Sequence, residues 1–594
     1  MKLRRDGKPH EKPHHPHWPL AALLFAFVFL LGMWSVHDPS TWIRVKVGAK
    51  ILADHALPRT EPFSYGAAGA PWTTHSWLSD VIFAKLDAWG GPVLLTFFKS
   101  LAIAAAFALL LPINHGSPMV AASLLAFGAF AAWPGYAETP MAFDLLFFSV
   151  FLRLLRPRHR FRWTDAAWAA ALTMLWSNLH GATAPLALWL VGMKVFKTTM
   201  RTAARERFGY WAMLLTCLIA FSWNPHGYGI LTHVFSDAAS GSGAWRLSLT
   251  SPAGLMILGG AVACWFTLQQ EFVTTLSCAA VLALSILLPG LRPLGVLAAC
   301  PVAALALGHA MKPRDDTWPR VARWCVFAAV LLACYVQAIA RTLAPSGGYG
   351  APALSGAVRF LDAAGVSGRM FNEPEAGAEL IGLTSRPVFV DRRQTLYPEA
   401  FRRDAADWPR LFHALDSIYA FDYAVLRNRR AGAPASVLDG DPDWTLAYAD
   451  DRALVYLKKS GADAAQAARS PFESLTPNRL WPDSLDAGLA DAKRAPKILA
   501  ELDRWAVAAP DSAQALLWKA YALGRLNDGA NADRLLELAR ERPILSWNPE
   551  LQALAAYDEA ARGRPDRARA LYRRARRAAR ALGDRALARE LEGR

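Results

Sequence analysis

Long apolar runs alternate with short polar segments along the first 341 residues, and the alternation stops after them. The runs are about 16 to 20 residues long, enough for a helix to cross a hydrocarbon core about 30 Å thick. We therefore expect a polytopic α-helical membrane domain over 19–341, with about eleven transmembrane helices. They are predicted near residues 19–36, 92–111, 118–133, 139–155, 165–178, 182–196, 209–223, 252–268, 272–289, 293–310 and 324–341.

The longest polar interruption lies between the first two apolar runs, at residues 37–91. It contains two amphipathic stretches, at 42–52 and 75–89, each of which predicts a short helix on a membrane surface. Two such helices are more structure than a simple connector needs. We therefore expect this loop to carry chemistry.

The pattern changes after the last apolar run. Residues 352–458 alternate short helical and strand patterns and predict a small α/β domain, in which the strand 388–390 is followed by Asp391 and Arg393. These two side chains either mark a ligand site at a strand end or simply pair with each other. After a linker, residues 486–594 predict helical hairpins whose small and aromatic residues resemble tetratricopeptide repeats at a period near 34 residues.

Basic residues predict the orientation of the chain. The tail 1–18 carries Lys2, Arg4 and Arg5, and no cleavage site follows the first span, so we expect a retained anchor with a cytoplasmic tail. Counting crossings from there makes three further basic loops cytoplasmic, near 153–162, 194–207 and 312–323. The loop 37–91 and everything after 342 are then extracytoplasmic. The net charge of +16 is partly this topology signal, so we do not take it as evidence for nucleic-acid binding.

Two charges lie inside predicted spans, Lys99 and Asp144. A charge in hydrocarbon is costly unless it is paired or lines a wet cavity, so each is a functional-site hypothesis. The simpler alternatives are an ion pair between the two residues, or snorkelling to the interface.

Two short motifs, WSNLHG and WNPHGYG, place polar residues at the outer ends of later spans. They supply Asn178 and His180, then Asn224 and His226. Both motifs are also ordinary turn sequences, so each can be purely structural.

Metal-ligand patterns are weak. All six cysteines fall inside predicted spans, where they are expected to be small core residues. The histidines of the tail, His10, His14, His15 and His17, suit a short polar tail as well as a metal tract. No protein metal site is predicted; the cofactor is unknown, and a divalent cation has no clear ligand motif.

The order of several motifs resembles a group of bacterial polytopic proteins related to the GT-C membrane glycosyltransferases. The resemblance covers about residues 20–460. It is carried by Asp38, Trp42 and Gly48, then PRTEPFSY, then the tryptophans and histidine at 72–77, then WSNLHG and WNPHG.

This resemblance implies a protein of the bacterial inner membrane that uses a polyprenyl-phosphate sugar donor and an extracytoplasmic glycan, lipid or protein acceptor. Asp38 matches the position of the group's catalytic carboxylate and would act as the base of an inverting transfer. The donor phosphate needs cations, for which Arg44, Lys46, Arg59 and Lys99 are the candidates. The remaining polar and aromatic candidates would line the substrate cavity: Trp42, Glu61, Trp72, His75, Asp144, Asn178, His180, Asn224 and His226.

The chain departs from the group's usual pattern at Arg44 and Ser76. This leaves open an alternative from another class, a non-catalytic scaffold or transport subunit of a surface-polysaccharide system. Its repeat-like region would recruit a protein partner. Asp38 would then serve only as a helix cap, a role in which Asp is favoured in any protein.

Overall fold

The computed structural model describes residues 18–33, 38, 40–111, 118–156, 161–201, 204–234, 251–269, 271–310, 320–342, 354–393, 396–428, 436–469, 471–480, 482–546, 548–582 and 585–593. The predicted tail, the predicted loop at 312–319 and the residues after WNPHGYG from 235 to 250 lie outside this part of the chain. The chain divides into two compact units. The first comprises Met1–Trp34, His75–Ser79 and Leu86–Val336, and the second comprises Ser35–Thr74, Asp80–Lys85 and Gln337–Arg594.

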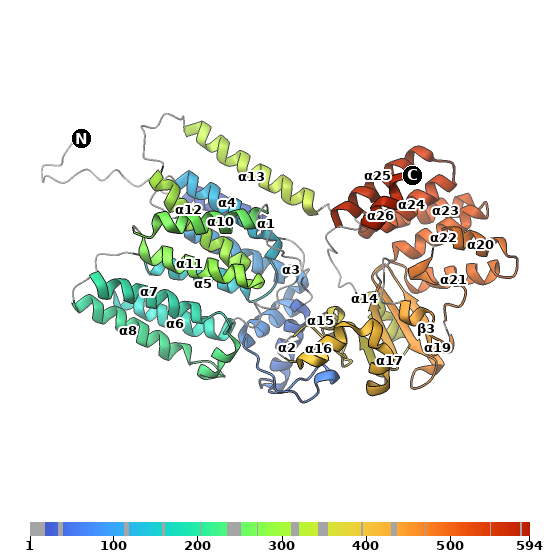
Figure 1. The fold of residues 1–594 in the computed structure, drawn as a ribbon, viewed down its shortest axis with the longest axis horizontal. Helices are drawn as coiled ribbons and strands as arrows, with labels where there is room; N and C mark the ends of the chain where they lie inside the picture. The colour runs from blue at the N-terminus through green and yellow to red at the C-terminus, as the bar shows by residue number, and fades with distance from the viewer. Residues whose placement is uncertain are drawn as a thin grey trace. The chain divides into compact units, whose positions relative to one another are not determined.

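The first unit is built of helices (Figure 1). Its elements are α1 (Trp18–Gly32), α3 (Trp77–Leu110), α4 (Pro118–Ala132), η3 (Trp133–Gly135), α5 (Met141–Leu154), α6 (Trp163–Leu179), α7 (Pro185–Arg201), α8 (Ala204–Phe221), η4 (Gly227–His233), α10 (Pro252–Thr267), α11 (Phe272–Leu287), η5 (Pro289–Leu291), α12 (Arg292–Ala310) and most of α13 (Arg320–Thr342).

A helix occupies each of the eleven predicted spans, but their lengths differ. Three described segments are long and apolar enough to cross a membrane: Trp77–Leu110, Pro118–Gly135 and Pro289–Gly308. Four other apolar helices are shorter, with 10–17 residues. The eleven crossings therefore remain a prediction, while the helical character of these segments is confirmed.

Close approaches between small residues hold the first unit together. α12 packs against α4, α10 and α11. A Cβ on Gly128 would lie 2.4 Å from Cys300 Sγ, and one on Gly260 would lie 2.6 Å from Ala299 Cβ. Because lipid tails give no hydrophobic drive between helices, such small-residue contacts are how membrane helices gain packing energy.

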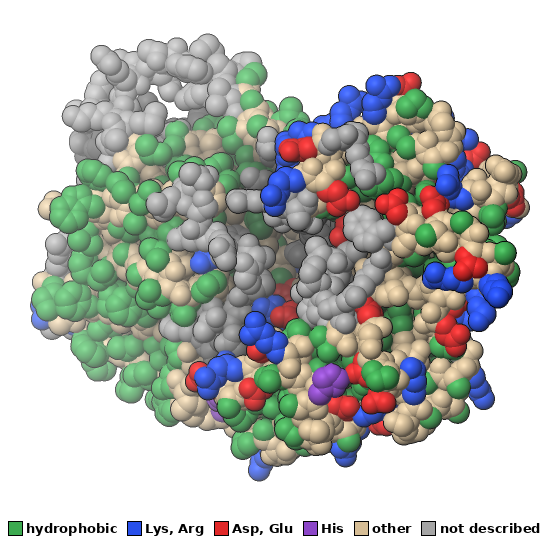
Figure 2. Space-filling view, turned by 45° about the vertical axis from the view of Figure 1, so that its right-hand side comes forward, with side chains coloured by type: hydrophobic (Ala, Val, Ile, Leu, Met, Phe, Trp, Pro, Cys, Tyr) green, Lys and Arg blue, Asp and Glu red, His purple; other side chains and the backbone are tan. Residues whose placement is uncertain are grey.

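The outside of the first unit is apolar. Trp265 is 82% exposed, Leu287 75% and Phe208 68%. Hydrophobic side chains cover much of the left of the view in Figure 2. An apolar exterior of this extent is not expected in water and is typical of helices that face lipid.

The second unit contains a four-stranded sheet in the order β1-β2-β4-β3. The strands are β1 (Met370–Asn372), β2 (Tyr423–Arg427), β3 (Trp444–Ala449) and β4 (Ala453–Lys458). β1 pairs with β2 in parallel, and the other pairs are antiparallel. Nearly every strand residue is buried, so both faces of the sheet are covered.

The helices of the second unit precede, interrupt and follow the sheet. They are α2 (Ser40–Asp54), η1 (Tyr65–Ala67), α14 (Ser355–Ala363), α15 (Pro374–Leu383), α16 (Glu399–Ala406), α17 (Trp408–Tyr419), α18 (Ser436–Asp439), α19 (Ala464–Arg469), η6 (Pro477–Arg479), α20 (Pro482–Ala490), α21 (Ala495–Ala508), α22 (Ala513–Arg525), α23 (Gly529–Arg540), η7 (Pro543–Ser546), α24 (Pro549–Ala561), α25 (Pro565–Leu582), α26 (Arg585–Glu590) and η8 (Leu591–Gly593).

A buried carboxylate ties the C-terminal helices to the sheet. Asp451, in the turn between β3 and β4, accepts hydrogen bonds from Ser512 Oγ at 2.8 Å, Ala513 N at 2.8 Å and Gln514 N at 2.7 Å. These donors begin α22, so Asp451 caps that helix. Burial raises the pKa of Asp451 to about 6.

The first polar loop folds as part of this second unit, a grouping that the sequence does not reveal. Ser64 forms a parallel bridge with Val388, and Tyr65 Oη donates to Met370 O at 2.6 Å. Residues 388–390, predicted as a strand, form only this isolated bridge. The bridge partner comes from the loop, while the side chain of Asn372 in β1 accepts from Phe389 N at 2.8 Å and donates to Val390 O at 2.7 Å.

Candidate active site

Asp38 lies at the start of α2 and is half-buried. Its Oδ1 accepts a hydrogen bond from Ser40 N at 2.9 Å, and its carbonyl accepts one from Thr41 N at 3.1 Å. This is the capping arrangement expected of Asp at a helix start. A carboxylate can accept several donors, so capping leaves room for a second role.

Close packing fixes α2 in place. It contacts α15, and a Cβ on Gly382 would lie 2.4 Å from Trp42 Cβ. On the same helix, a Cβ on Gly48 would lie 1.9 Å from the carbonyl oxygen of Asp80. Residues larger than Gly do not fit at either position without a shift of the backbone. The position of Asp38 is thus set by a rigid neighbourhood.

The candidate phosphate-binding cations of the second unit differ in whether they form an ion pair with a described residue. Arg44 Nη1 lies 3.3 Å from Asp80 Oδ1, with both side chains largely buried. Lys46 is half-buried and Arg59 is exposed, and neither forms an ion pair with a described residue. Lys46 and Arg59 are therefore the cations of this unit that are best placed to accept an anion.

A buried charge cluster joins the first loop to the α/β region. Arg393 Nη1 lies 2.6 Å from Glu61 Oε2, and Arg393 Nη2 lies 2.6 Å from Asp391 Oδ2. The guanidinium also stacks 4.8 Å from the ring of Trp72, and Tyr397 Oη donates to Asp391 Oδ2 at 3.0 Å. Burial lowers the pKa of Arg393, but Asp391 and Glu61 outweigh it, so the net shift is upward.

Glu61 also organises its own turn. Its Oε1 accepts hydrogen bonds from Phe63 N at 2.7 Å and Ser64 N at 2.8 Å. With both of its oxygens engaged, Glu61 is a structural carboxylate, and Asp391 follows the pairing alternative of the sequence analysis. Glu61 and Trp72, predicted to line the substrate cavity, thus lie in this cluster.

In the first unit, Lys99 pairs with Glu138. Their charged atoms lie 2.6 Å apart, and the side chains are 2% and 0% exposed. Thr96 Oγ1 also donates to Glu138 Oε1 at 3.3 Å. The sequence allowed a pair between Lys99 and Asp144, and this was wrong, because each has a different partner. Glu138 was not singled out in the sequence.

Asp144 is the centre of a second buried network. Its Oδ2 lies 2.7 Å from His180 Nδ1, and its Oδ1 accepts from Trp176 Nε1 at 2.8 Å and from Thr183 Oγ1 at 2.6 Å. An imidazole that donates its Nδ1–H to a carboxylate keeps the lone pair of Nε2. This is the arrangement of a carboxylate that orients a histidine base.

A row of imidazole rings leads outward from this pair. The ring centroids of His75 and His180 are 6.3 Å apart, and those of His75 and His233 are 6.0 Å apart. His180 is buried, whereas His75 and His233 are half-buried. The sequence indicated His75 and His180 but missed His233, which is separated from them along the chain and carries no motif.

Asn178, Asn224 and His226 make mainly local contacts. Asn178 accepts from Trp77 Nε1 at 3.0 Å and donates to Trp223 O at 2.8 Å. Asn224 accepts from the backbone N–H of His226 at 2.9 Å and donates to Gly227 O at 3.1 Å. These bonds close the turns that join the helices, which is the structural alternative raised for both motifs.

Within the described ranges, no group of three or more His, Cys, Asp or Glu side chains is placed to hold a metal ion.

No protein-family model matches the chain, and no curated protein sequence matches it. Eighteen chains of solved structures are similar to it, among them an oligosaccharyltransferase and two structures of ArnT. The oligosaccharyltransferase of Archaeoglobus fulgidus in the apo form shares 12% identity with a TM-score of 0.45, over 70% of this chain and 70% of that one.

The other two structures are of ArnT from Cupriavidus metallidurans, and both alignments cover 74% of this chain and 97% of that one. The apo state has 14% identity and a TM-score of 0.44, and the form bound to undecaprenyl phosphate has 12% identity and a TM-score of 0.42. Oligosaccharyltransferase and ArnT are GT-C glycosyltransferases, the group that the sequence resembles. At these TM-scores the likeness is distant, and the functional argument rests on the chain's own residues.

Proposed function

We propose that this protein is an inverting membrane glycosyltransferase that takes a sugar from a polyprenyl-phosphate donor, with Asp38 as the general base. The observation that carries the proposal is the start of α2. A half-buried carboxylate, Asp38, precedes a helix that carries the cation Lys46, and packing fixes the position of this helix. A sugar hydroxyl needs a base within hydrogen-bond reach, and a departing phosphate needs positive charge.

The apolar exterior of the first unit suits the donor. A polyprenyl chain dissolves in lipid, so an enzyme that uses it must present its chemistry at a membrane. Three helices long enough to cross the bilayer and the exposed Trp265, Leu287 and Phe208 provide that setting.

The proposed orientation places the loop 37–91 and the C-terminal regions together outside the cytoplasm. The Glu61–Arg393 contact supports their common location, because two segments that pair at 2.6 Å must lie on the same side of a membrane. The basic loops of the sequence supply the direction, with the amino terminus inside. A cysteine placed at exposed Arg59 would then react with an impermeant thiol reagent in intact cells.

The test is transfer of a labelled sugar. The purified full chain is mixed with undecaprenyl-phosphate-linked tritiated hexoses and a membrane extract as the acceptor source, and label leaving the lipid fraction is counted. Asp38→Asn should lower the rate by about 100-fold or more, as expected for loss of a general base. Because Asn caps helices as well as Asp, this variant keeps its fold.

The matched control is Asp54→Asn, at the other end of the same helix. Asp54 is exposed, and its ion-pair partner among the described residues is Lys50 at 2.8 Å, so its loss should leave the rate within about twofold. A fully active Asp38→Asn variant would show that Asp38 is not the base, whereas a wild type that transfers no sugar would favour the scaffold function.

A further inference from the structure

The exposed face of α25 is strongly basic. Its exposed arginines recur at intervals of one to four residues and follow most of the 18-residue helix: Arg567, Arg569, Arg573, Arg574, Arg577 and Arg580. From Arg567 to Arg580 the row extends about 20 Å along the helix axis. In Figure 2, Lys and Arg side chains gather at the upper right of the view, over the C-terminal helices.

The opposite face of α25 is fixed in the core. Ala568, Tyr572, Ala575 and Ala579 are buried against α24 and the last helix of the chain. The helix cannot rotate to hide its arginines without exposing these residues. The basic face is therefore a constant part of the surface.

Acidic neighbours do not neutralise this face. Arg569 pairs with Asp566 at 2.7 Å, and Arg580 and Arg576 share the single carboxylate of Glu592 at 2.5 and 3.8 Å. Arg567 and Arg573 form no ion pair with any described residue. Positive charge remains in excess.

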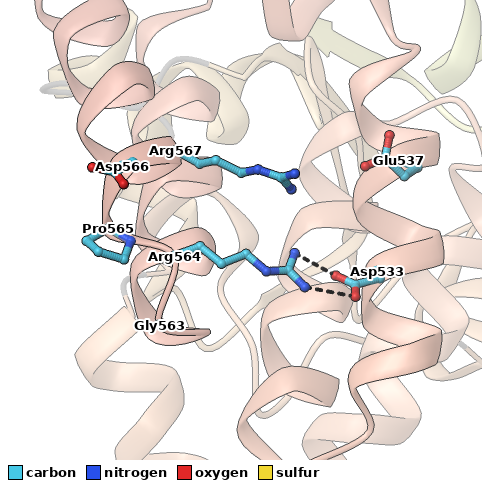
Figure 3. Close-up of a pocket in the computed structure, with 7 residues that line it drawn as sticks. All are labelled: Asp533, Glu537, Gly563, Arg564, Pro565, Asp566 and Arg567. Carbon is cyan, nitrogen blue, oxygen red and sulfur yellow. Dashed lines mark hydrogen bonds and ion pairs between the residues drawn. The ribbon is translucent and has the colours of Figure 1, made fainter.

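A pocket of about 640 Å³ opens at the start of this face, between α23 and α25. Figure 3 shows Arg567 reaching across it from α25, above the Arg564–Asp533 pair. Both oxygens of Asp533 accept from Arg564 at 3.0 Å, which lowers the pKa of Asp533. The pocket thus contains the Arg564–Asp533 ion pair and, beside it, Arg567, which forms no ion pair with a described residue.

The other acids of the pocket are also engaged. Glu537 pairs with Arg540, and Asp566 pairs with Arg569. Arg567 is then the charge in this pocket that is left for a ligand, and that ligand must be an anion.

The same face lacks apolar anchors. The exposed large hydrophobic side chains of the C-terminal helices are Val507, Leu526 and Leu538, and none belongs to α25. A protein interface relies on buried aromatic or aliphatic anchors, and a membrane-surface helix inserts apolar side chains. Contact through charge alone suits a flexible, hydrated polymer whose negative groups repeat along its length.

We propose that the basic face of α25, together with the pocket at its start, binds an acidic polysaccharide. The carboxylates of successive sugars would meet Arg567, Arg573 and Arg577 as bidentate partners, the geometry for which guanidinium groups are suited. Such a surface would hold a glycan close to the enzyme, and it stands whether or not the glycosyltransferase proposal is correct.

The test uses the full chain in a neutral detergent with polygalacturonate as the probe, measured by biolayer interferometry. Wild type should bind it, and the affinity should fall steeply between about 50 and 300 mM NaCl, because the contact is electrostatic. The triple variant Arg567→Gln, Arg573→Gln, Arg577→Gln should raise the Kd about tenfold or more. All three side chains are exposed, so the fold is retained.

The matched control removes three other surface charges, by Arg403→Gln, Arg410→Gln and Lys497→Gln. It has the same net charge as the triple variant and should bind within about twofold of wild type. Equal weakening of both variants would mean that only net charge matters and would overturn the proposal. Binding to vesicles of phosphatidylglycerol without binding to polygalacturonate would overturn it in favour of a membrane contact.

Discussion

Glu61 Oε2 lies 2.6 Å from Arg393 Nη1, so the first polar loop and the α/β region share one buried ion pair. Asp391 binds the same guanidinium, which therefore compensates two carboxylates whose side chains are 0% exposed. This cluster, more than any strand pairing, fixes the loop that carries Asp38.

Removal of the arginine should therefore be severe. Arg393→Ala leaves Glu61 and Asp391 buried together without their cation, which should lower the free energy of unfolding by about 3 to 5 kcal/mol. Urea unfolding in detergent, followed by tryptophan fluorescence, measures it. Arg403→Ala, on an exposed pair with Glu399 at 4.0 Å, should change stability by less than about 0.5 kcal/mol. A loss below about 1 kcal/mol for Arg393→Ala would contradict the role given to the cluster.

The packing of α2 predicts an effect of a single methyl group. Gly48→Ala places a Cβ 1.9 Å from the carbonyl oxygen of Asp80, so the helix must move. We expect a loss of about 1 to 3 kcal/mol, the range for overpacked sites, and reduced transfer activity because Asp38 moves with the helix. At Gly440, where nothing lies within 4 Å, the same substitution should be neutral in both a melting curve and the transfer assay.

The buried pair of the first unit should behave as a unit in a double-mutant cycle. Lys99→Met leaves Glu138 unpaired in an apolar interior, at a cost of about 3 to 5 kcal/mol. Lys99→Met combined with Glu138→Leu removes both charges and should recover most of that loss. Thermal denaturation in lipid nanodiscs compares the wild type, Lys99→Met, Glu138→Leu and the double variant. If the double variant is the least stable, the pair has a role beyond charge compensation.

The free energy of unfolding should depend on the ionisation of Asp451, the buried carboxylate that caps α22. Burial raises the pKa of Asp451 to about 6, against 3.8 for the ordinary group, and burial likewise raises that of Asp558 to about 6. Between these pH values the folded state binds more protons than the unfolded state. The contribution of each of these two groups to stability is therefore largest below about pH 4 and is lost as pH rises to about 6, by about 1 to 3 kcal/mol for each group.

The measurement is urea unfolding of the second unit at pH 4.5 and 6.5, followed through Trp505 and Trp518. Asp451→Asn should flatten the pH dependence, because one of the two titrating groups is gone. The exposed Asp503→Asn serves as the control, and an unchanged slope in Asp451→Asn would show that its pKa does not control this range.

Hydrophobic periodicity was enough to locate the helices of the first unit to within a few residues. It could not pair distant segments. The bridge between Ser64 and Val388 and the Glu61–Arg393 pair join residues that have no local pattern in common. Residues 388–390 resemble a strand in composition, yet their bridge partner lies in the first loop, and the sheet contacts them through the side chain of Asn372.

Site prediction had a similar limit. A charged residue in an apolar run can be recognised from the sequence, because placing a charge in hydrocarbon costs free energy. Lys99 and Asp144 were found in this way. Glu138 and Thr183, which contact these two residues, were not found, because Glu138 lies in a polar turn and Thr183 belongs to no motif. The sequence shows how far along a helix a residue lies but not which side of the helix it is on. A pair between Lys99 and Asp144 was therefore compatible with the sequence.

The ion pair between Glu61 and Arg393 can form only late in translation, because the two residues are far apart in the sequence. The ribosome must add roughly 330 residues after Glu61 before its partner exists, which takes about 20 to 60 s at 5 to 20 residues per second. During that interval the first loop has left the ribosome, and the Glu61 carboxylate is hydrated because Arg393 has not yet been synthesised. Chaperones or proteases that recognise unfinished segments would therefore meet this loop first, and a translation pause before Arg393 would lengthen its exposure.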